Sequence, residues 1–214
     1  MQNKTLIFDL DATLYYVGDK IERLCDDKVV SYLIENIGVD EMQAHKLIKK
    51  FREKYRYDSE AVEKEFPVKQ RDFVEYVCDV SADDIPQDKE LAAILKQISN
   101  TKYILTDSTQ KHSKDVLNKM QVDVNLFTYI YDAHDMNYVF KYRKECFEQF
   151  LSKFNLKAKD CIMFEDSAKN LEVAKSCGMI TVYIKPNQTE KPKFADYMFS
   201  DIKTALKEFF QHCV

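Results

Sequence analysis

The 214-residue chain has few of the residues that interrupt helices or build flexible linkers. It contains only 3 glycines and 4 prolines, so low-complexity linkers are not expected and helical structure is favoured. It also lacks any apolar run long enough to cross a membrane. The length is sufficient for one good-sized domain, or for a core that carries an insert.

Paired cysteines and a strong charge of one sign are missing as well. The 6 cysteines are scattered without a Cys-x-x-Cys pair, which argues against zinc and against a small disulfide scaffold, so we expect reduced thiols. The net charge of -4 gives no reason to expect a nucleic acid polymer or an anionic membrane as a partner. Met1 to Lys4 lead into an apolar run that Asp9 interrupts, so we expect no signal peptide and a soluble, cytoplasmic protein.

What is present is an alternation of short apolar runs and helical patterns. The runs predict strands at residues 5–8, 102–106, 128–131, 161–164 and 180–184. Helices are predicted between the last four strands, over residues 87–99 before them, and from Ser200 or Asp201 after them. Asp107 or Ser108 is the expected N-cap of the helix that follows the second strand. This order predicts an α/β fold, a Rossmann-like parallel sheet with helices on both faces.

Residues 16–86 show helical spacing only. A helix is predicted from residue 20 to 37, where Gly38 ends it, and a second is capped by Asp40. Shorter helices are expected at residues 60–66 and 70–80. The predicted domains are therefore a core of residues 1–15 and 87–214 and a helical insert of residues 16–86. The basic residues of the insert are interpreted as a solvated helix face, with contact to a nucleotide as the alternative: Arg52, Lys54 and Arg56.

Polar residues follow three of the predicted strands. Asp9 and Asp11 follow the first strand, Thr106 ends the second, and the fourth ends in Glu165 and Asp166. Because the carboxyl ends of parallel strands share one edge, these groups are expected to converge on one crevice. Carboxylates are the ligands that suit Mg²⁺.

Two further features of the sequence bear on this crevice. Lys141 lies before a predicted helix and can supply balancing positive charge, while the Thr106 hydroxyl and the following helix N-terminus offer donors to an anion. His134 is in a loop that could border the site, but it is interpreted as solvated. The other three histidines have no partner at the spacing of a site: His45, His112 and His212.

Four motifs in this order resemble those of one protein family. They are Asp9-Leu10-Asp11-Ala12-Thr13, the apolar strand ending in Thr106, the lysine Lys141 before a helix, and Phe164-Glu165-Asp166-Ser167. Together they cover nearly the whole chain and are similar to the motifs of the haloacid dehalogenase (HAD) superfamily of aspartate-nucleophile phosphatases. Asp9 to Asp11 with Leu14-Tyr15, and the run from Asp166 to Asn170, most resemble the pyrimidine 5′-nucleotidase branch. The position of the insert is that of the family's helical cap.

The resemblance implies a two-step hydrolysis. Asp9 would attack phosphorus and form an aspartyl-phosphate. Asp11 would protonate the leaving oxygen and later take a proton from the attacking water. An aspartate at this second position disfavours a dehalogenase, which has no alkoxide to protonate.

The resemblance also implies a cofactor and a phosphate-binding set. Mg²⁺ would be held by Asp9, the carbonyl of Asp11 and Asp166, with Glu165 behind these ligands. The phosphoryl oxygens would be bound by three residues of two loops: Thr106, Asp107 and Lys141.

Two positions depart from the family pattern. Asp107 stands where an asparagine is usual, and its negative charge would weaken the binding of phosphate. Tyr142 stands where a proline is usual, and without proline at the first helical position the motif loses rigidity. Arg143 or Lys144 is therefore the alternative to Lys141 as the base that faces phosphate.

The function predicted from these residues is a Mg²⁺-dependent phosphomonoester hydrolase acting on a small phosphorylated metabolite, such as a nucleoside 5′-monophosphate. The alternatives are a sugar-phosphate or phosphoglycolate phosphatase, a phosphoglucomutase, or a non-catalytic phosphate-binding member, which Asp107 and Tyr142 keep open. A receiver-type signalling domain is disfavoured by the large insert and by the place of Asp9 on the first strand. The sequence leaves open whether the protein is a monomer or a dimer.

Overall fold

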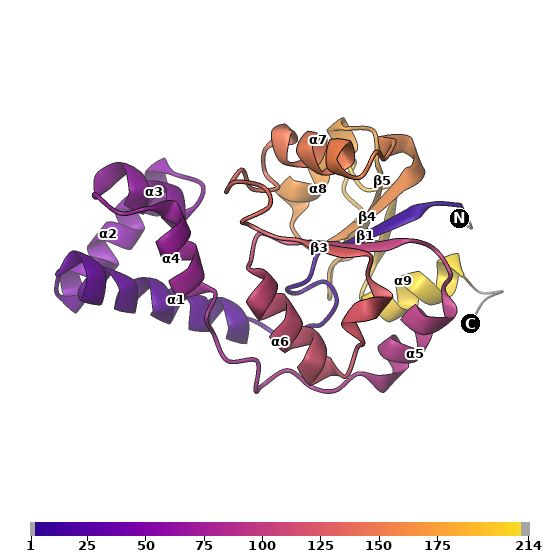
Figure 1. The fold of residues 1–214 in the computed structure, drawn as a ribbon, viewed down its shortest axis with the longest axis horizontal. Coiled ribbons are helices and arrows are strands. Elements are labelled where there is room, and N and C mark those ends of the chain that lie inside the picture. Colours follow the sequence, from indigo (N-terminus) through magenta and orange to yellow (C-terminus); the bar gives the residue numbers. More distant parts are fainter. Residues whose placement is uncertain (1–2, 211–214) are drawn as a thin grey trace. The chain divides into compact units, whose positions relative to one another are not determined.

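A computed structural model describes residues 3–210 of the chain. The chain forms two compact units, and Figure 1 shows the fold of each. One unit, here called the core unit, combines the N-terminal segment up to Tyr16 with the chain from Ala82 onward. The other, here called the helical unit, is Val17–Ser81.

The core unit is built on a parallel sheet with the strand order β3-β2-β1-β4-β5-β6. The prediction of a parallel α/β sheet is confirmed, but the prediction of only five strands is wrong. The sixth strand has three residues and lies half exposed at the sheet edge, so it has no buried apolar run by which it could be recognised. The strands are β1 (Thr5–Phe8), β2 (Lys102–Leu105), β3 (Tyr129–Tyr131), β4 (Cys161–Glu165), β5 (Ile180–Ile184) and β6 (Tyr197–Phe199).

Helices cover both faces of this sheet, as predicted. Figure 1 shows α7 and α8 on one face, and α5, α6 and α9 on the other. Their bounds are α5 (Lys89–Gln97), α6 (Gln110–Met120), α7 (Lys144–Lys153), α8 (Ala168–Ser176) and α9 (Ile202–Phe209), with short 3-10 turns at Val124–Leu126 and Ala158–Asp160.

The N-cap of α6 differs from the prediction. Thr109, not Asp107 or Ser108, caps the helix: its hydroxyl oxygen accepts from the His112 backbone N–H at 3.3 Å. The side chain of Asp107 is instead bonded to a distant loop, since its carboxylate accepts from the Lys141 backbone N–H. The prediction of an N-cap uses only adjacent residues, whereas the Asp107 carboxylate is used in a tertiary contact with the Lys141 backbone.

β1 is the strand that positions the site. It lies between β2 and β4 in parallel register, and Phe8 pairs with both Ile104 and Phe164. The Phe8 and Phe164 rings stack at a centroid distance of 4.8 Å. β2 and β3 lie on one side of β1, and β4 to β6 on the other. The carboxyl end of β1 is thus at the point where the strand order reverses, which is where open α/β sheets bind ligands.

The helical unit consists of four helices. α1 (Lys20–Tyr32) continues as a π-helical turn (Leu33–Ile37), and Gly38 ends it at φ 83°, in the left-handed region that glycine adopts most readily. Asp40 and Gln43 form the capping box of α2. Tyr32 packs edge-on against Phe73, with ring centroids 4.9 Å apart, at the centre of the unit. The remaining bounds are α2 (Glu41–Lys54), α3 (Asp58–Glu65) and α4 (Gln70–Val77).

Two predictions concern the whole chain. Within residues 3–210, no disulfide joins any of Cys25, Cys78, Cys146, Cys161 and Cys177. Cys213 and His212 lie outside the described residues, as do Met1 and Gln2. In the span from residue 3 to residue 210, none of the helices has the length and apolar character needed to cross a bilayer.

Candidate active site

The turn after β1 folds back onto the first carboxylate. Ala12 adopts φ 60°, and the Leu14 N–H donates to the Leu10 carbonyl at 2.9 Å. This turn brings the Thr13 hydroxyl to within 2.9 Å of Asp9 Oδ2, to which it donates. Asp9 is therefore held at the carboxyl end of β1, with only 5% of its surface exposed.

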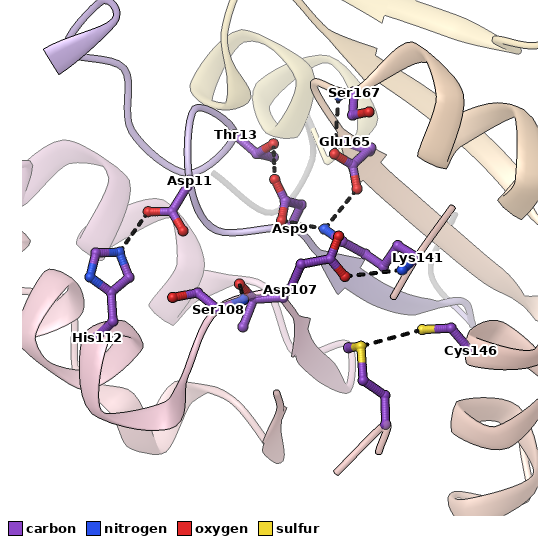
Figure 2. Close-up of polar contacts among 12 residues, drawn as sticks. Asp9, Asp11, Thr13, Asp107, Ser108, His112, Lys141, Cys146, Glu165 and Ser167 are labelled. Atoms are coloured by element: carbon purple, nitrogen blue, oxygen red, sulfur yellow. Dashed lines mark hydrogen bonds and ion pairs between the residues drawn. The ribbon is translucent and has the colours of Figure 1, made fainter. Parts of the chain in front are cut away.

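Lys141 reaches the same carboxylate from the loop before α7. Its Nζ donates to Asp9 Oδ1 at 2.5 Å and to Glu165 Oε2 at 2.9 Å (Figure 2). The lysine side chain is only 2% exposed. The other two candidate bases, at the start of α7, are exposed and have other partners: Arg143 Nε donates to the Tyr142 hydroxyl, and Lys144 pairs with Glu148. Of the three, Lys141 is the base placed against Asp9.

Burial and charge shift the protonation of this cluster. Burial raises the pKa of Asp9 to about 7, with Lys141 opposing the rise and Asp166 adding to it. Burial and the neighbouring Asp9 charge raise the pKa of Glu165 well above its usual range. Burial alone would lower the pKa of Lys141, but the charges of Asp9 and Glu165 raise it well above the ordinary value. Lys141 is therefore the charged cation of a site with excess negative charge.

Three carboxylates of the site are close enough together to hold one metal ion. Oxygens of Asp9, Glu165 and Asp166 lie within 4.8 Å of one another. The three carboxylates outnumber the one buried ammonium, that of Lys141, and a divalent cation would favour the ionised forms of Asp9 and Glu165 that burial disfavours. Lys185 also approaches Asp166 at 3.4 Å, but its side chain is 41% exposed, so solvent screens it. An all-oxygen set of this kind fits Mg²⁺.

The three carboxylates differ in their access to solvent. The Glu165 side chain is 1% exposed, and its two oxygens accept from Lys141 Nζ and from the Ser167 N–H. The side chain of Asp166 is 20% exposed. A Mg²⁺ ion keeps several waters, so Asp166 is better placed than Glu165 to bind it, and Glu165 is suited to orienting Lys141.

The loop after β2 supplies the predicted phosphate-binding groups. Thr106 is 1% exposed, and its Oγ1 accepts from the Ser108 N–H at 3.1 Å, so its own O–H is left to donate. Asp107 Oδ1 accepts from the Lys141 backbone N–H at 3.0 Å. The aspartate that departs from the family pattern thus ties the loop of Lys141 to the end of β2.

Asp11 has a partner that the sequence analysis missed. His112 Nε2 lies 2.8 Å from Asp11 Oδ1, and the Tyr15 hydroxyl donates to the same oxygen at 2.5 Å. Burial alone would raise the pKa of Asp11, but the hydrogen bond and charge of His112, with the bond from Tyr15, hold it below its usual range. The expectation that His112 has no partner is wrong.

A helical pattern could have drawn attention to His112. It precedes Val116 by four residues and Met120 by eight, and both of those lie in the core, so all three share one face of α6. The contact itself joins residues 101 positions apart in the chain, which no local pattern reveals.

Comparison with known proteins identifies the class. The chain matches the haloacid dehalogenase-like hydrolase family over residues 3–178, and it belongs to that family. No curated protein matches it.

Solved structures share the fold at low identity. One is a HAD phosphatase from Thermococcus onnurineus, 18% identical, with 96% of this chain and 97% of that one covered and a TM-score of 0.65. Another is the putative HAD-hydrolase YfnB from Bacillus subtilis bound to magnesium, at 16% identity, 100% and 99% coverage and a TM-score of 0.62. The L-2-haloacid dehalogenase RSc1362 also matches, at 14% identity, 99% and 100% coverage and a TM-score of 0.61. The fold thus fits both phosphatases and dehalogenases, and the site residues have to distinguish them.

Proposed function

We propose that this HAD-like hydrolase is a Mg²⁺-dependent phosphomonoesterase with Asp9 as its nucleophile. The observation that carries the proposal is the buried Lys141 ammonium against Asp9 Oδ1 and Glu165 Oε2, next to Asp166. A cation fixed beside a carboxylate can bind the phosphoryl oxygens during the attack of that carboxylate on phosphorus. Asp9 and Asp166, with the Asp11 carbonyl, would hold Mg²⁺, which when bound offsets the repulsion between carboxylate and phosphate.

The proposed reaction has two displacements at phosphorus. In the first, an oxygen of Asp9 bonds to phosphorus, and the bond to the leaving oxygen breaks as that oxygen takes a proton from Asp11. In the second, water gives a proton to Asp11 and attacks phosphorus, and the bond between phosphorus and the Asp9 oxygen breaks, which releases phosphate and regenerates Asp9. The Thr106 hydroxyl and the backbone N–H of Asp107, with Lys141, would bind the phosphoryl oxygens.

Asp11 favours a phosphatase over a dehalogenase. A halide leaves as an anion and needs no proton, so a dehalogenase has no use for an acid at this position. Here two hydrogen bonds, from Tyr15 and with His112, hold the Asp11 side chain in place.

The substrate proposed is a nucleoside 5′-monophosphate. Its support is the resemblance of the motifs around Asp9 and Asp166 to the pyrimidine 5′-nucleotidase branch. Arg52 and Lys54 of the helical unit add no support, because Arg52 pairs with Asp26 and Asp58, and Lys54 pairs with Glu65.

The test is phosphate release from a panel of phosphomonoesters, with Mg²⁺ and with EDTA, beside Asp9→Asn. The panel contains UMP, CMP, AMP, phosphoglycolate and hexose phosphates. We expect Mg²⁺-dependent release of phosphate that falls at least about a thousandfold in Asp9→Asn. The preferred substrate would identify the branch of the family. Halide release from a 2-haloacid without phosphate release would favour a dehalogenase. Hexose phosphate conversion through a phosphoenzyme would favour a mutase.

A further inference from the structure

His112 is an unusual residue for the interior of α6. Only 3% of its surface is exposed, and its Nδ1 is buried without a hydrogen-bond partner within residues 3–210. Burial of a ring nitrogen without a partner costs stability, and an apolar side chain would pack on the core face of α6 without that cost. The polar contact that offsets this cost is the one between His112 Nε2 and Asp11 Oδ1, at 2.8 Å.

The proton on the ring can be assigned from these contacts. The Asp11 carboxylate beside Nε2 favours the charged ring, whereas the unpartnered Nδ1 favours the neutral ring. In the charged ring both nitrogens carry protons, and in the neutral ring the proton belongs on Nε2, where an acceptor is present. In either state Nε2–H donates to Asp11.

Asp11 Oδ1 therefore accepts two hydrogen bonds. One comes from His112 Nε2 and the other from the Tyr15 hydroxyl, at 2.5 Å. Figure 2 shows the imidazole meeting one carboxylate oxygen of Asp11 while the other oxygen lies outside that contact. An oxygen that accepts two donors is a poor place for a proton, so the proton of the acid form is directed to Oδ2.

We propose that His112 and Tyr15 are positioning residues that hold Asp11 Oδ1, so that Oδ2 carries the proton passed to the leaving oxygen. This inference rests on the proposed function. In the first step, the bond between phosphorus and the leaving oxygen breaks, and its electron pair takes the proton from Oδ2. In the second step, Oδ2 takes a proton from the attacking water. Neither positioning residue touches the reacting atoms.

The test compares two substrates that need this proton to different extents. An alkyl phosphomonoester expels a strongly basic alkoxide, whereas p-nitrophenyl phosphate expels a weakly basic phenolate. The measurement is the single-turnover rate of leaving-group release, with Mg²⁺, for the wild type and four variants. The variants are His112→Leu, which removes the donor, His112→Gln, whose amide N–H can replace Nε2–H, Tyr15→Phe, and the control Ser113→Ala. Ser113 is the next residue of α6, is equally buried and bonds the Thr109 carbonyl.

We expect His112→Leu to slow release of the alkoxide by about tenfold to a hundredfold and release of the nitrophenolate by no more than about threefold. Tyr15→Phe should shift the ratio of the two rates in the same direction by a smaller factor. His112→Gln should restore most of the wild-type ratio, and Ser113→Ala should keep it.

Three results would overturn the inference while leaving the proposed function intact: equal losses on both substrates, no loss in His112→Leu, or no rescue by His112→Gln. If His112→Leu does not fold, His112→Gln and Tyr15→Phe are compared with the wild type. Tyr15→Phe must then change the ratio of the two release rates, and His112→Gln must keep most of the wild-type ratio. A wild-type protein that releases neither leaving group would overturn the proposed function first, and the inference with it.

Discussion

The two units of the molecule use charged side chains in opposite ways. In the core unit, the side chains of Lys141, Asp9 and Glu165 are 2%, 8% and 1% exposed, and Lys141 contacts both carboxylates. In the helical unit, Arg52 and Asp26 pair at 48% and 47% exposure. Charges removed from water interact strongly and shift each other's pKa, whereas exposed pairs are screened and contribute little. The buried cluster is therefore where we expect chemistry. The exposed pairs lie on the surface of the helical unit and contribute little to its stability.

The sharpest test of this contrast is the removal of the buried cation. Lys141→Met should lower phosphatase kcat/KM by about a hundredfold or more, because it removes the cation beside Asp9. The matched control is Lys144→Met, which removes an exposed lysine of α7 that pairs with Glu148, and it should stay within about twofold of the wild type. Steady-state kinetics of both variants decide the matter. A larger loss of kcat/KM in Lys144→Met than in Lys141→Met would make Lys144 the phosphate-facing base.

A weaker effect is expected from Asp107, which accepts from the Lys141 backbone N–H. Asp107→Ala should lower kcat/KM by about tenfold, because the loop of Lys141 loses this anchor. Asp107→Asn should remain close to the wild type, since an amide oxygen accepts the same bond. If the asparagine variant were as impaired as the alanine variant, the negative charge of Asp107 and not its hydrogen bond would be what matters.

The pH dependence of Mg²⁺ binding should report on the buried carboxylates. Burial raises the pKa of Asp9 from 3.8 to about 7, so between these values the unfolded chain loses a proton that the folded, metal-free protein keeps. The Asp9 contribution to stability therefore falls as pH rises toward 7. Mg²⁺ requires the ionised carboxylate, so the rise in Tm on adding Mg²⁺ should be larger at about pH 8 than at about pH 5.5. Thermal unfolding with and without Mg²⁺ measures this, and a shift independent of pH would contradict it.

The smallest effect is expected in the helical unit. Arg52→Gln should change the free energy of unfolding by no more than about 1 kcal/mol, and less at high salt, although Arg52 contacts both Asp26 and Asp58. Phe51→Ala, at the adjacent position of α2, removes a fully buried ring and should cost about 3–5 kcal/mol. Urea unfolding of the two variants gives both values. A larger loss in Arg52→Gln than in Phe51→Ala would show that exposed charges hold this unit together.

Local sequence signals predicted much of the fold. β1 and β5 have the predicted bounds, and Gly38 ends the first helical segment as expected, because a buried apolar run and a left-handed glycine are properties of a few adjacent residues. β6 was missed because its three half-exposed residues depend on pairing with β5. Thr109 was missed as the cap of α6 because Asp107, the nearer acidic residue, is used in a tertiary contact.

The sequence by itself determined the family, the parallel sheet and the carboxylates at its edge, since motif residues lie at strand ends and strand ends share that edge. Only the tertiary structure decided which side chains meet. It placed Lys141 and not Arg143 or Lys144 against Asp9, joined Asp107 to the Lys141 backbone across 34 positions, and brought His112 to Asp11 across 101. The physical reason is that hydrogen bonds act over about 3 Å in space, whereas a sequence pattern reports only on neighbours along the chain.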